Sequence, residues 1–305
     1  MIKVKPQPRI GIDLGGTKIE AILMDPKGKI IQTERLPTPK DSYSETLFSI
    51  AEIIQSLSAS DNLPIGIGTP GAISLLTDLM KNCNSTFLNG MNFQKDLEKK
   101  LGRRVRIAND ADCFTLSEAS DGAAKNDSLV FGVILGTGVG GGICLDGQLI
   151  TGINAICGEW GHNTLPLASY KGNNEPKPGR NCYCGKVDCV ETWLSGPGLQ
   201  RTFKETTGQE CSAQDVVMKA MQGEEAACEV LDQYHNLLAL GLSTVINILD
   251  PHVIVLGGGM SNVKSIYVET KKYLNQYVFS DQINNKIVPA LHGDSSGVRG
   301  AAWLW

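Results

Sequence analysis

The chain has no hydrophobic run long enough to cross a membrane, and no apolar stretch near its N-terminus of the kind that a secretory signal peptide carries. It also lacks a large excess of one charge, because 28 Lys and Arg residues stand against 32 Asp and Glu residues. The net charge of −4 gives no general attraction to nucleic acid or to an anionic membrane. We therefore expect a cytoplasmic protein that acts on small molecules.

No low-complexity segment and no long linker interrupts the 305 residues, a length that typically divides into two domains. Short apolar runs typical of strands are followed by helical patterns twice, first from residue 9 and again from residue 129. This duplication predicts two α/β domains with a cleft between them. We expect the first domain to comprise residues 1–120 with the C-terminal segment 291–305, and the second to comprise residues 121–290.

A glycine-rich turn occurs twice, at 11–18 (GIDLGGTK) and at 135–142 (LGTGVGGG), each time between two strand-like runs. Glycines let backbone N–H groups and a Thr hydroxyl approach phosphate oxygens closely. Two such hairpin tips predict an ATP-dependent phosphotransferase whose halves hold one polyphosphate. The competing interpretation of either turn alone is a tight hairpin without a ligand.

Two other nucleotide-binding motifs are excluded. Gly136, Gly138 and Gly141 match G-x-G-x-x-G, but that dinucleotide motif requires a helix to begin there. Here the chain continues into 143–150, which predicts a short strand at 143–145 and a hairpin turn at Asp146-Gly147. The first turn is not a Walker A motif, because Lys18 enters a strand.

Asp110 lies where a strand predicted at 105–108 meets a helix predicted at 111–124. A carboxylate at the carboxyl end of a strand suits a ligand site in an α/β sheet. A kinase that acts on a hydroxyl needs a base to accept its proton, and the helix N-terminus would keep Asp110 ionised. The alternative is that Asn109 or Asp110 only caps the helix.

His162, Cys182, Cys184 and Cys189 fit a closed tetrahedral zinc site with three thiolates and one imidazole. A metal there would hold the polar segment Lys171–Arg180, which is too poor in apolar residues to form a core. We expect the other six cysteines to be small core residues: Cys83, Cys113, Cys144, Cys157, Cys211 and Cys228. Glu159 and Glu191 flank the metal segment and could accept hydrogen bonds from sugar hydroxyls, although a typical Glu is a solvated surface charge.

Five motifs in this order resemble the ROK family of bacterial sugar kinases, over residues 9–305: 13–18, 108–111, 136–140, 158–162 and the cysteine trio. Within that family, 84–90, 247–262 and 292–305 are similar to the bacterial ROK fructokinases.

The resemblance implies two actin-like ATPase domains of the ribonuclease H-like type, with ATP, Mg²⁺ and a structural Zn²⁺. It implies Asp110 as catalytic base, with Asn109, Glu159, His162 and Glu191 on the sugar, and His162, Cys182, Cys184 and Cys189 on the metal. The nucleotide residues that it implies are Gly11, Ile12, Asp13, Leu14, Gly15, Gly16, Thr17, Lys18, Gly136, Thr137, Gly138, Val139, Gly140, Gly257 and Gly258, with 257–260 near the adenosine.

The resemblance favours a homodimeric fructokinase that makes fructose 6-phosphate, with mannose, glucose or N-acetylglucosamine as alternative substrates. A sugar-responsive repressor is disfavoured, because only eight residues precede Arg9 and a DNA-binding module needs more. A sugar-binding protein without activity is the remaining alternative. Because the phosphate turns lie outside the metal segment, we expect the zinc site to support the sugar pocket and to affect the ATP site much less.

Overall fold

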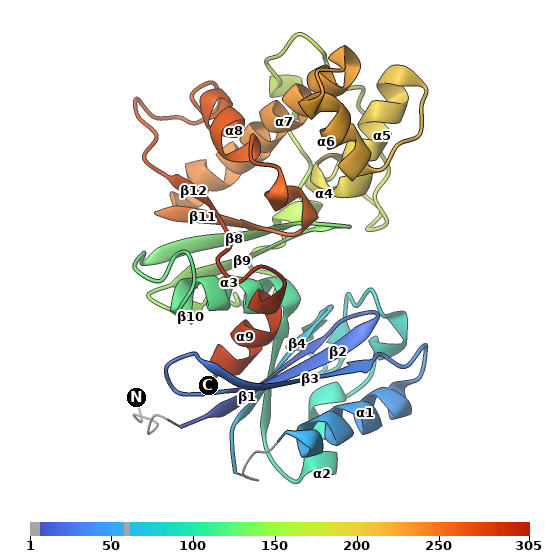
Figure 1. The fold of residues 1–305 in the computed structure, drawn as a ribbon, viewed down its shortest axis with the longest axis vertical. Coiled ribbons are helices and arrows are strands. Elements are labelled where there is room, and N and C mark those ends of the chain that lie inside the picture. The colour runs from blue at the N-terminus through green and yellow to red at the C-terminus, as the bar shows by residue number, and fades with distance from the viewer. Residues whose placement is uncertain (1–6, 58–61) are drawn as a thin grey trace. The chain divides into compact units, whose positions relative to one another are not determined.

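The computed structural model describes residues 7–57 and 62–305, which form two compact units (Figure 1). Unit 1 comprises Met1–Asn126, Gly142–Cys157 and Leu291–Trp305, and unit 2 comprises Asp127–Gly141 and Gly158–Ala290. The segment Gly142–Cys157, which the sequence analysis groups with the second domain, lies with unit 1. Within the described ranges, no helix combines the length and the apolar character that a membrane span needs.

Unit 1 is built on a five-stranded sheet with the order β3-β2-β1-β4-β7. The first three strands are antiparallel neighbours, whereas β4 and β7 continue the sheet in parallel. The strands are β1 (Arg9–Leu14), β2 (Lys18–Met24), β3 (Ile30–Pro37), β4 (Ile65–Thr69) and β7 (Val105–Asn109), with a small hairpin of β5 (Ala72–Ile73) and β6 (Met80–Lys81). The helices are α1 (Tyr43–Ser56), η1 (Thr86–Leu88), α2 (Phe93–Leu101), α3 (Asp110–Ser120), η5 (Gly293–Ser295) and α9 (Ser296–Trp303).

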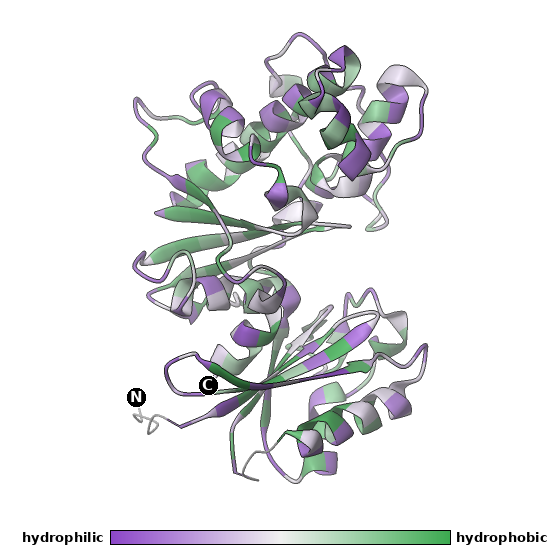
Figure 2. Ribbon diagram, viewed as in Figure 1, coloured by the Kyte–Doolittle hydropathy of each residue, from purple (hydrophilic) through white to green (hydrophobic). Residues whose placement is uncertain are grey.

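Alternation along β1 explains how the sheet is covered. Ile10 and Ile12 point to one face, where they share a buried core with Ile50 of α1 and Phe93 of α2. Gly11 points to the other face, which α9 covers. Figure 2 shows the apolar character of the sheet strands and the mixed character of the helices around them.

The contacts of α9 are closer than side chains allow. A Cβ atom built on Gly66 would lie 1.8 Å from the Ala301 carbonyl oxygen, and one on Gly300 would lie 1.6 Å from the Cys113 carbonyl oxygen. The C-terminal helix is therefore held between the sheet and α3 by backbone contact on both sides, and these contacts fix the strand ends that carry the candidate residues.

The second sheet has the order β10-β9-β8-β11-β12. Strands β8, β11 and β12 and the start of β9 belong to unit 2, whereas the rest of β9 and β10 belong to the segment Gly142–Cys157 of unit 1. Counted along the chain, both sheets have the order third, second, first, fourth, fifth, which confirms the predicted duplicated ribonuclease H-like fold of the actin-like ATPases. The strands are β8 (Leu129–Leu135), β9 (Val139–Leu145), β10 (Gln148–Leu149), β11 (Val253–Gly257) and β12 (Lys286–Pro289). The helices are η2 (Trp160–His162), η3 (Leu167–Ser169), α4 (Val190–Leu194), α5 (Gly196–Thr207), α6 (Ala213–Met221), α7 (Glu225–Leu249), η4 (Gly259–Asn262) and α8 (Ile266–Leu274).

Three expectations need correction. Strand β9 begins at Val139 and not at 143, because glycines have low strand propensity and concealed its first half. Helix α3 ends at Ser120 and not at 124, because the Glu118 carboxylate accepts the Ala123 backbone N–H and turns the chain. Of the six cysteines expected in the core, Cys228 is exposed and two are only half-buried, Cys157 and Cys211.

Gly300→Ala should destabilise unit 1, because its Cβ overlaps the Cys113 carbonyl oxygen and the sheet on the other side prevents α9 from moving away from α3. The expected loss is about 1–3 kcal/mol of unfolding free energy, measured by denaturant titration. Gly16→Ala is the matched control, since no heavy atom lies within 4 Å of its Cβ position. Equal stability of the two variants would show that α9 can shift to accommodate the methyl group without loss of unfolding free energy.

Candidate functional site

The first glycine turn joins β1 to β2 in unit 1. The Gly15 N–H donates to the Lys18 carbonyl oxygen over 3.0 Å, which closes the hairpin. Thr38 holds the turn from β3's end, because its hydroxyl donates to the Gly15 carbonyl oxygen (2.7 Å) and its N–H to the Thr17 carbonyl oxygen (3.0 Å). The tip is thus a fixed structure whose residues Gly16, Thr17 and Lys18 are exposed.

The predicted nucleotide residues of this segment fall into two groups: some are packed inside unit 1, and others lie at the open tip of the turn. Ile12 and Leu14 are core residues, and Gly11 lies beneath α9. Gly16 has no heavy atom within 4 Å of its Cβ position, and its φ is not positive, so nothing inside the protein requires glycine there. The open space at Gly16 suits the close approach of a ligand.

Asp13 is the second-last residue of β1, and its carboxylate lies against Gly68 and against Gly297, the second residue of α9. The pKa of Asp13 is raised from 3.8 to about 6, chiefly by burial and then by the negative charges of Asp110 and Glu20, which outweigh the opposite effect of Lys18. The site therefore holds more negative charge than its own side chains neutralise, as is typical of a place that receives a cation.

Asp110 is the first residue of α3 and is exposed. Its Oδ1 accepts the Ala111 N–H (2.8 Å), and the same N–H also reaches Oδ1 of Asn109 (2.9 Å), the N-cap. The capping interpretation therefore holds for Asn109. Asp110 remains a candidate catalytic base, because its carboxylate lies at the positive end of a helix and near Asp13.

The second glycine turn joins β8 to β9 in unit 2, and the Gly136 N–H closes it on the Gly138 carbonyl oxygen (2.9 Å). Gly136 resembles Gly16, since the only heavy atom within 4 Å of its Cβ position is Cγ2 of Ile134, at 3.9 Å. Gly258, at φ +79°, packs directly on the Leu135 backbone. The two predicted nucleotide segments thus meet at the carboxyl ends of the parallel strands β8 and β11, the usual ligand edge of such a sheet.

The four predicted metal ligands come together in unit 2. The donor atoms of His162, Cys182, Cys184 and Cys189 all lie within 4.8 Å of one another. Nδ1 of His162 is 3.6 Å from Sγ of Cys182, and Sγ of Cys184 is 3.6 Å from Sγ of Cys189. Tetrahedral zinc with Zn–S bonds of about 2.3 Å separates two sulfurs by about 3.7 Å, so the donor set fits zinc.

Backbone pairing brings the ligands together from distant parts of the segment. Thr164 and Cys189 form an isolated antiparallel bridge, and the Val190 N–H donates to the Asn163 carbonyl oxygen (2.9 Å). A tight turn between Cys182 and Gly185, which has φ +88°, supplies the other ligand pair. His162 turns its second ring nitrogen to the Tyr183 hydroxyl (3.0 Å), an arrangement that leaves Nδ1 for a metal.

Sequence reasoning missed the charged residues that hold this segment. Arg180 is buried, lies over the Trp193 ring at 3.5 Å, and pairs with Glu205 (2.7 Å). Asp188 is buried at φ +55° and accepts the backbone N–H groups of Gly179 and Arg180. A polar loop gives no signal for a buried arginine, because its partners lie up to 25 residues further along the chain.

Glu191 and Glu159 differ in their surroundings. Glu159 is exposed at the start of η2. Glu191 is half-buried in α4, where its Oε2 accepts the Val139 N–H of the second glycine turn (3.1 Å) and its Oε1 lies 4.0 Å from Sγ of Cys182. The second glycine turn and the metal segment are therefore in direct contact through Glu191, a contact that the sequence analysis did not anticipate.

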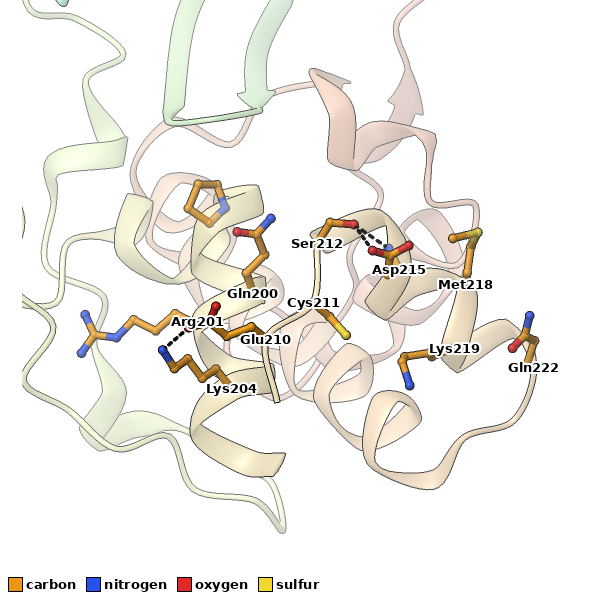
Figure 3. Close-up of a pocket in the computed structure, with 11 residues that line it drawn as sticks. Gln200, Arg201, Lys204, Glu210, Cys211, Ser212, Asp215, Met218, Lys219 and Gln222 are labelled. Carbon is orange, nitrogen blue, oxygen red and sulfur yellow. Dashed lines mark hydrogen bonds and ion pairs between the residues drawn. The ribbon is translucent and has the colours of Figure 1, made fainter. Parts of the chain in front are cut away.

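A pocket of about 820 Å³ lies between α5 and α6, shown in Figure 3. Most of its lining side chains are polar or charged, and two of them, Lys204 and Glu210, form an ion pair. Its one link to the candidate residues is Pro197, which follows Gly196, whose N–H donates to the Gly136 carbonyl oxygen (2.8 Å). The pocket therefore adjoins the second glycine turn but contains none of the predicted site residues.

The model of the ROK family matches residues 9–305. The chain belongs to the ROK family. It is 40% identical over 296 residues to the N-acetyl-D-glucosamine kinase of Vibrio parahaemolyticus serotype O3:K6, covering 96% of this chain and 98% of the relative. The N-acetyl-D-glucosamine kinase of Aliivibrio salmonicida is similar to the same extent, 40% identical with the same coverage.

Among solved structures, the chain is similar to the ROK hexokinase from Thermus thermophilus, with a TM-score of 0.85, 26% identity and 97% of each chain covered. A ROK glucokinase from Streptomyces griseus has the same fold, with a TM-score of 0.78 and 24% identity over 97% of this chain and 98% of that one. The fructose specificity expected from the sequence finds no support in these relatives.

Asp13→Asn should stabilise the ligand-free protein at pH 7.5 and not at pH 4. A carboxyl group whose pKa is raised on folding stabilises the folded state while it is protonated, and this contribution disappears as pH rises from 3.8 to about 6. Melting temperatures of both proteins across this range measure the effect. A difference that stays constant with pH would contradict the raised pKa.

Proposed function

We propose that this chain is an ATP-dependent sugar kinase that phosphorylates N-acetylglucosamine at its 6-hydroxyl. The observation that carries the sugar assignment is the 40% identity, over 96% of the chain, to N-acetyl-D-glucosamine kinases. N-acetylglucosamine, an alternative in the sequence analysis, thus takes the place of fructose. The glycine turns and the carboxylate of Asp110 support the kinase chemistry.

The proposed reaction transfers the terminal phosphoryl group of ATP to the sugar hydroxyl. Asp110 accepts the hydroxyl proton as the oxygen attacks, and the N-terminus of α3 keeps this carboxylate ionised before the transfer. Asn109, the neighbouring N-cap, stays a predicted sugar ligand. Its second role as a cap fixes the position of its side chain relative to Asp110.

The nucleotide assignment rests on the turn tips. Gly16 and Gly136 each leave room that a Cβ would fill, so phosphate oxygens can reach the backbone and the hydroxyls of Thr17 and Thr137. Mg²⁺, when bound, supplies neutralisation of the phosphate charge. We expect Asp13 to hold Mg²⁺, because the negative charges of Asp110 and Glu20 lie near its carboxylate and a cation would neutralise them.

The zinc assignment rests on the donor set of His162, Cys182, Cys184 and Cys189. Four protein ligands leave no position for an activated water, so the metal has a structural role. Glu159, His162 and Glu191 remain the proposed sugar ligands of unit 2. A homodimer also stays a prediction.

Purified protein assayed with ATP should use N-acetylglucosamine better than fructose, glucose or mannose, with kcat/KM higher by roughly 10-fold or more. A site that hydrogen-bonds a substrate group discriminates against analogues that lack it. A coupled assay of ADP release across the four sugars, with the product identified by NMR, measures this. Higher kcat/KM for fructose would restore the fructokinase assignment, and no turnover with any sugar would refute the kinase.

Asp110→Asn should lower kcat by a factor on the order of 10²–10⁴, the usual contribution of a general base, and leave sugar affinity nearly intact. Asp146→Asn is the matched control in unit 1, since Asp146 is exposed in a turn at φ +50°, which Asn also adopts. Steady-state kinetics and sugar titration calorimetry measure both variants. An Asp110→Asn variant with kcat close to that of the control would remove the base assignment.

A further inference from the structure

The metal segment packs against the second glycine turn and is joined to it by three hydrogen bonds. Nε1 of Trp160 donates to the Gly140 carbonyl oxygen (3.0 Å), Oε2 of Glu191 accepts the Val139 N–H (3.1 Å), and the Gly196 N–H donates to the Gly136 carbonyl oxygen (2.8 Å). Each partner lies near the ligand cluster in sequence. Trp160 precedes His162 by two residues, and Glu191 follows Cys189 by two residues.

Glu191 has the closest contact with the turn. A Cβ atom built on Gly138 would lie 2.5 Å from Oε2 of Glu191, so glycine at 138 makes room for this carboxylate. Gly138 thereby differs from Gly136, whose open side faces no protein atom closer than 3.9 Å. The second oxygen of Glu191 lies 4.0 Å from Sγ of Cys182, so a single side chain spans the turn and the cluster.

The start of α5 is fixed by the same segment. Ser195 ends α4 and is the N-cap of α5, and its N–H donates to the Glu191 carbonyl oxygen (3.2 Å). Arg180 joins the two helices, because its guanidinium donates to the carbonyl oxygens of Thr192 (2.9 Å) and Gly198 (3.3 Å). The Gly196 contact with the turn therefore depends on how the metal segment is folded.

We propose that Glu191 is a positioning residue for the second glycine turn, and that the four-ligand cluster, by holding α4, sets the nucleotide affinity of that turn. This role is separate from the proposed contact of Glu191 with sugar, and it rests on the proposed function in one respect, that the turn binds phosphate. The positioning itself concerns the protein alone and can be measured without any ligand.

The test compares Glu191→Ala with Glu191→Gln in the full-length, zinc-loaded protein without sugar. Glu191→Ala removes the acceptor of the Val139 N–H, so amide hydrogen exchange in 136–140 should become faster, and the Kd of a non-hydrolysable ATP analogue should rise roughly 10-fold. Glu191→Gln retains an oxygen that accepts this N–H, so its Kd should stay within about threefold of the wild type. Glu175→Gln, an exposed glutamate of unit 2, is the control for loss of a charge.

The outcomes separate this proposal from the proposed function. Unchanged exchange in Glu191→Ala, or a Kd that rises equally in Glu191→Gln, would overturn the positioning role. Faster exchange with unchanged Kd would overturn the proposed control of affinity and leave the turn's contact with Glu191 standing. Gly136→Val tests the phosphate role alone, because it fills the space left for the ligand without reaching Glu191.

A second variant covers the case in which Glu191→Ala does not fold. Trp160→Phe removes the Nε1 donor to the Gly140 carbonyl oxygen and keeps an aromatic ring beside Phe131. Amide hydrogen exchange in 136–140 should again become faster than in the wild type. Unchanged exchange would contradict the proposed support of the turn by the metal segment.

The zinc content and the effect of chelation test the proposed role of the four-ligand cluster. Elemental analysis should find close to one zinc per chain, and chelation should speed exchange in 136–140 in the wild type and less in Glu191→Ala, where the contact is already lost. Chelated protein that keeps its tertiary circular dichroism and slow exchange would overturn the role of the cluster.

Discussion

Close backbone contact is the constraint on which both units depend. In unit 1 the C-terminal helix touches the sheet at Gly66 and touches α3 at Gly300. In unit 2 a Cβ on Gly161 would lie 2.0 Å from the Val139 carbonyl oxygen. Where two backbones pack so closely that a Cβ atom has no room between them, the elements cannot slide past one another without overlap of backbone atoms. The strand ends and turn tips that carry the candidate residues therefore sit on elements whose spacing is fixed.

Within this framework, charge distinguishes neighbouring carboxylates in unit 1. Glu20 is buried, but hydrogen bonds from Arg35 and Lys18 outweigh its burial and lower its pKa. Asp13, whose backbone pairs with that of Glu20 from the neighbouring strand β1, is half-buried and has no ion pair within residues 7–57 and 62–305; loss of hydration around its carboxylate is the main cause of its raised pKa. At neutral pH a carboxylate with a raised pKa lowers folding stability, so Asp13 is a candidate for a role other than folding.

The elements with a strong periodic pattern were predictable from the sequence. The strand expected at 105–108 is β7 in the structure, one residue longer, and each glycine turn lies between two strands as expected. The proximity of the four candidate metal ligands was also predictable, since Cys and His at this spacing have few other uses in a polar segment. The support around the cluster was not, because the burial of Arg180 and Asp188 depends on Trp193 and α5, and tertiary contacts of this kind leave no local pattern. The same reason explains why the contact of Glu191 with Val139, 52 residues apart, was missed.

The position of Glu191 has a thermodynamic consequence for how the two proposed substrates affect each other's affinity. One carboxylate accepts a backbone N–H of the glycine turn and is also a proposed sugar ligand. If sugar hydroxyls draw on the same oxygens, the geometry of the turn changes when sugar binds, and the affinity for nucleotide changes with it. Linkage then requires that nucleotide change the affinity for sugar by the same factor. The proposed sugar ligand and the proposed phosphate turn would then be coupled within unit 2 itself, through a single side chain.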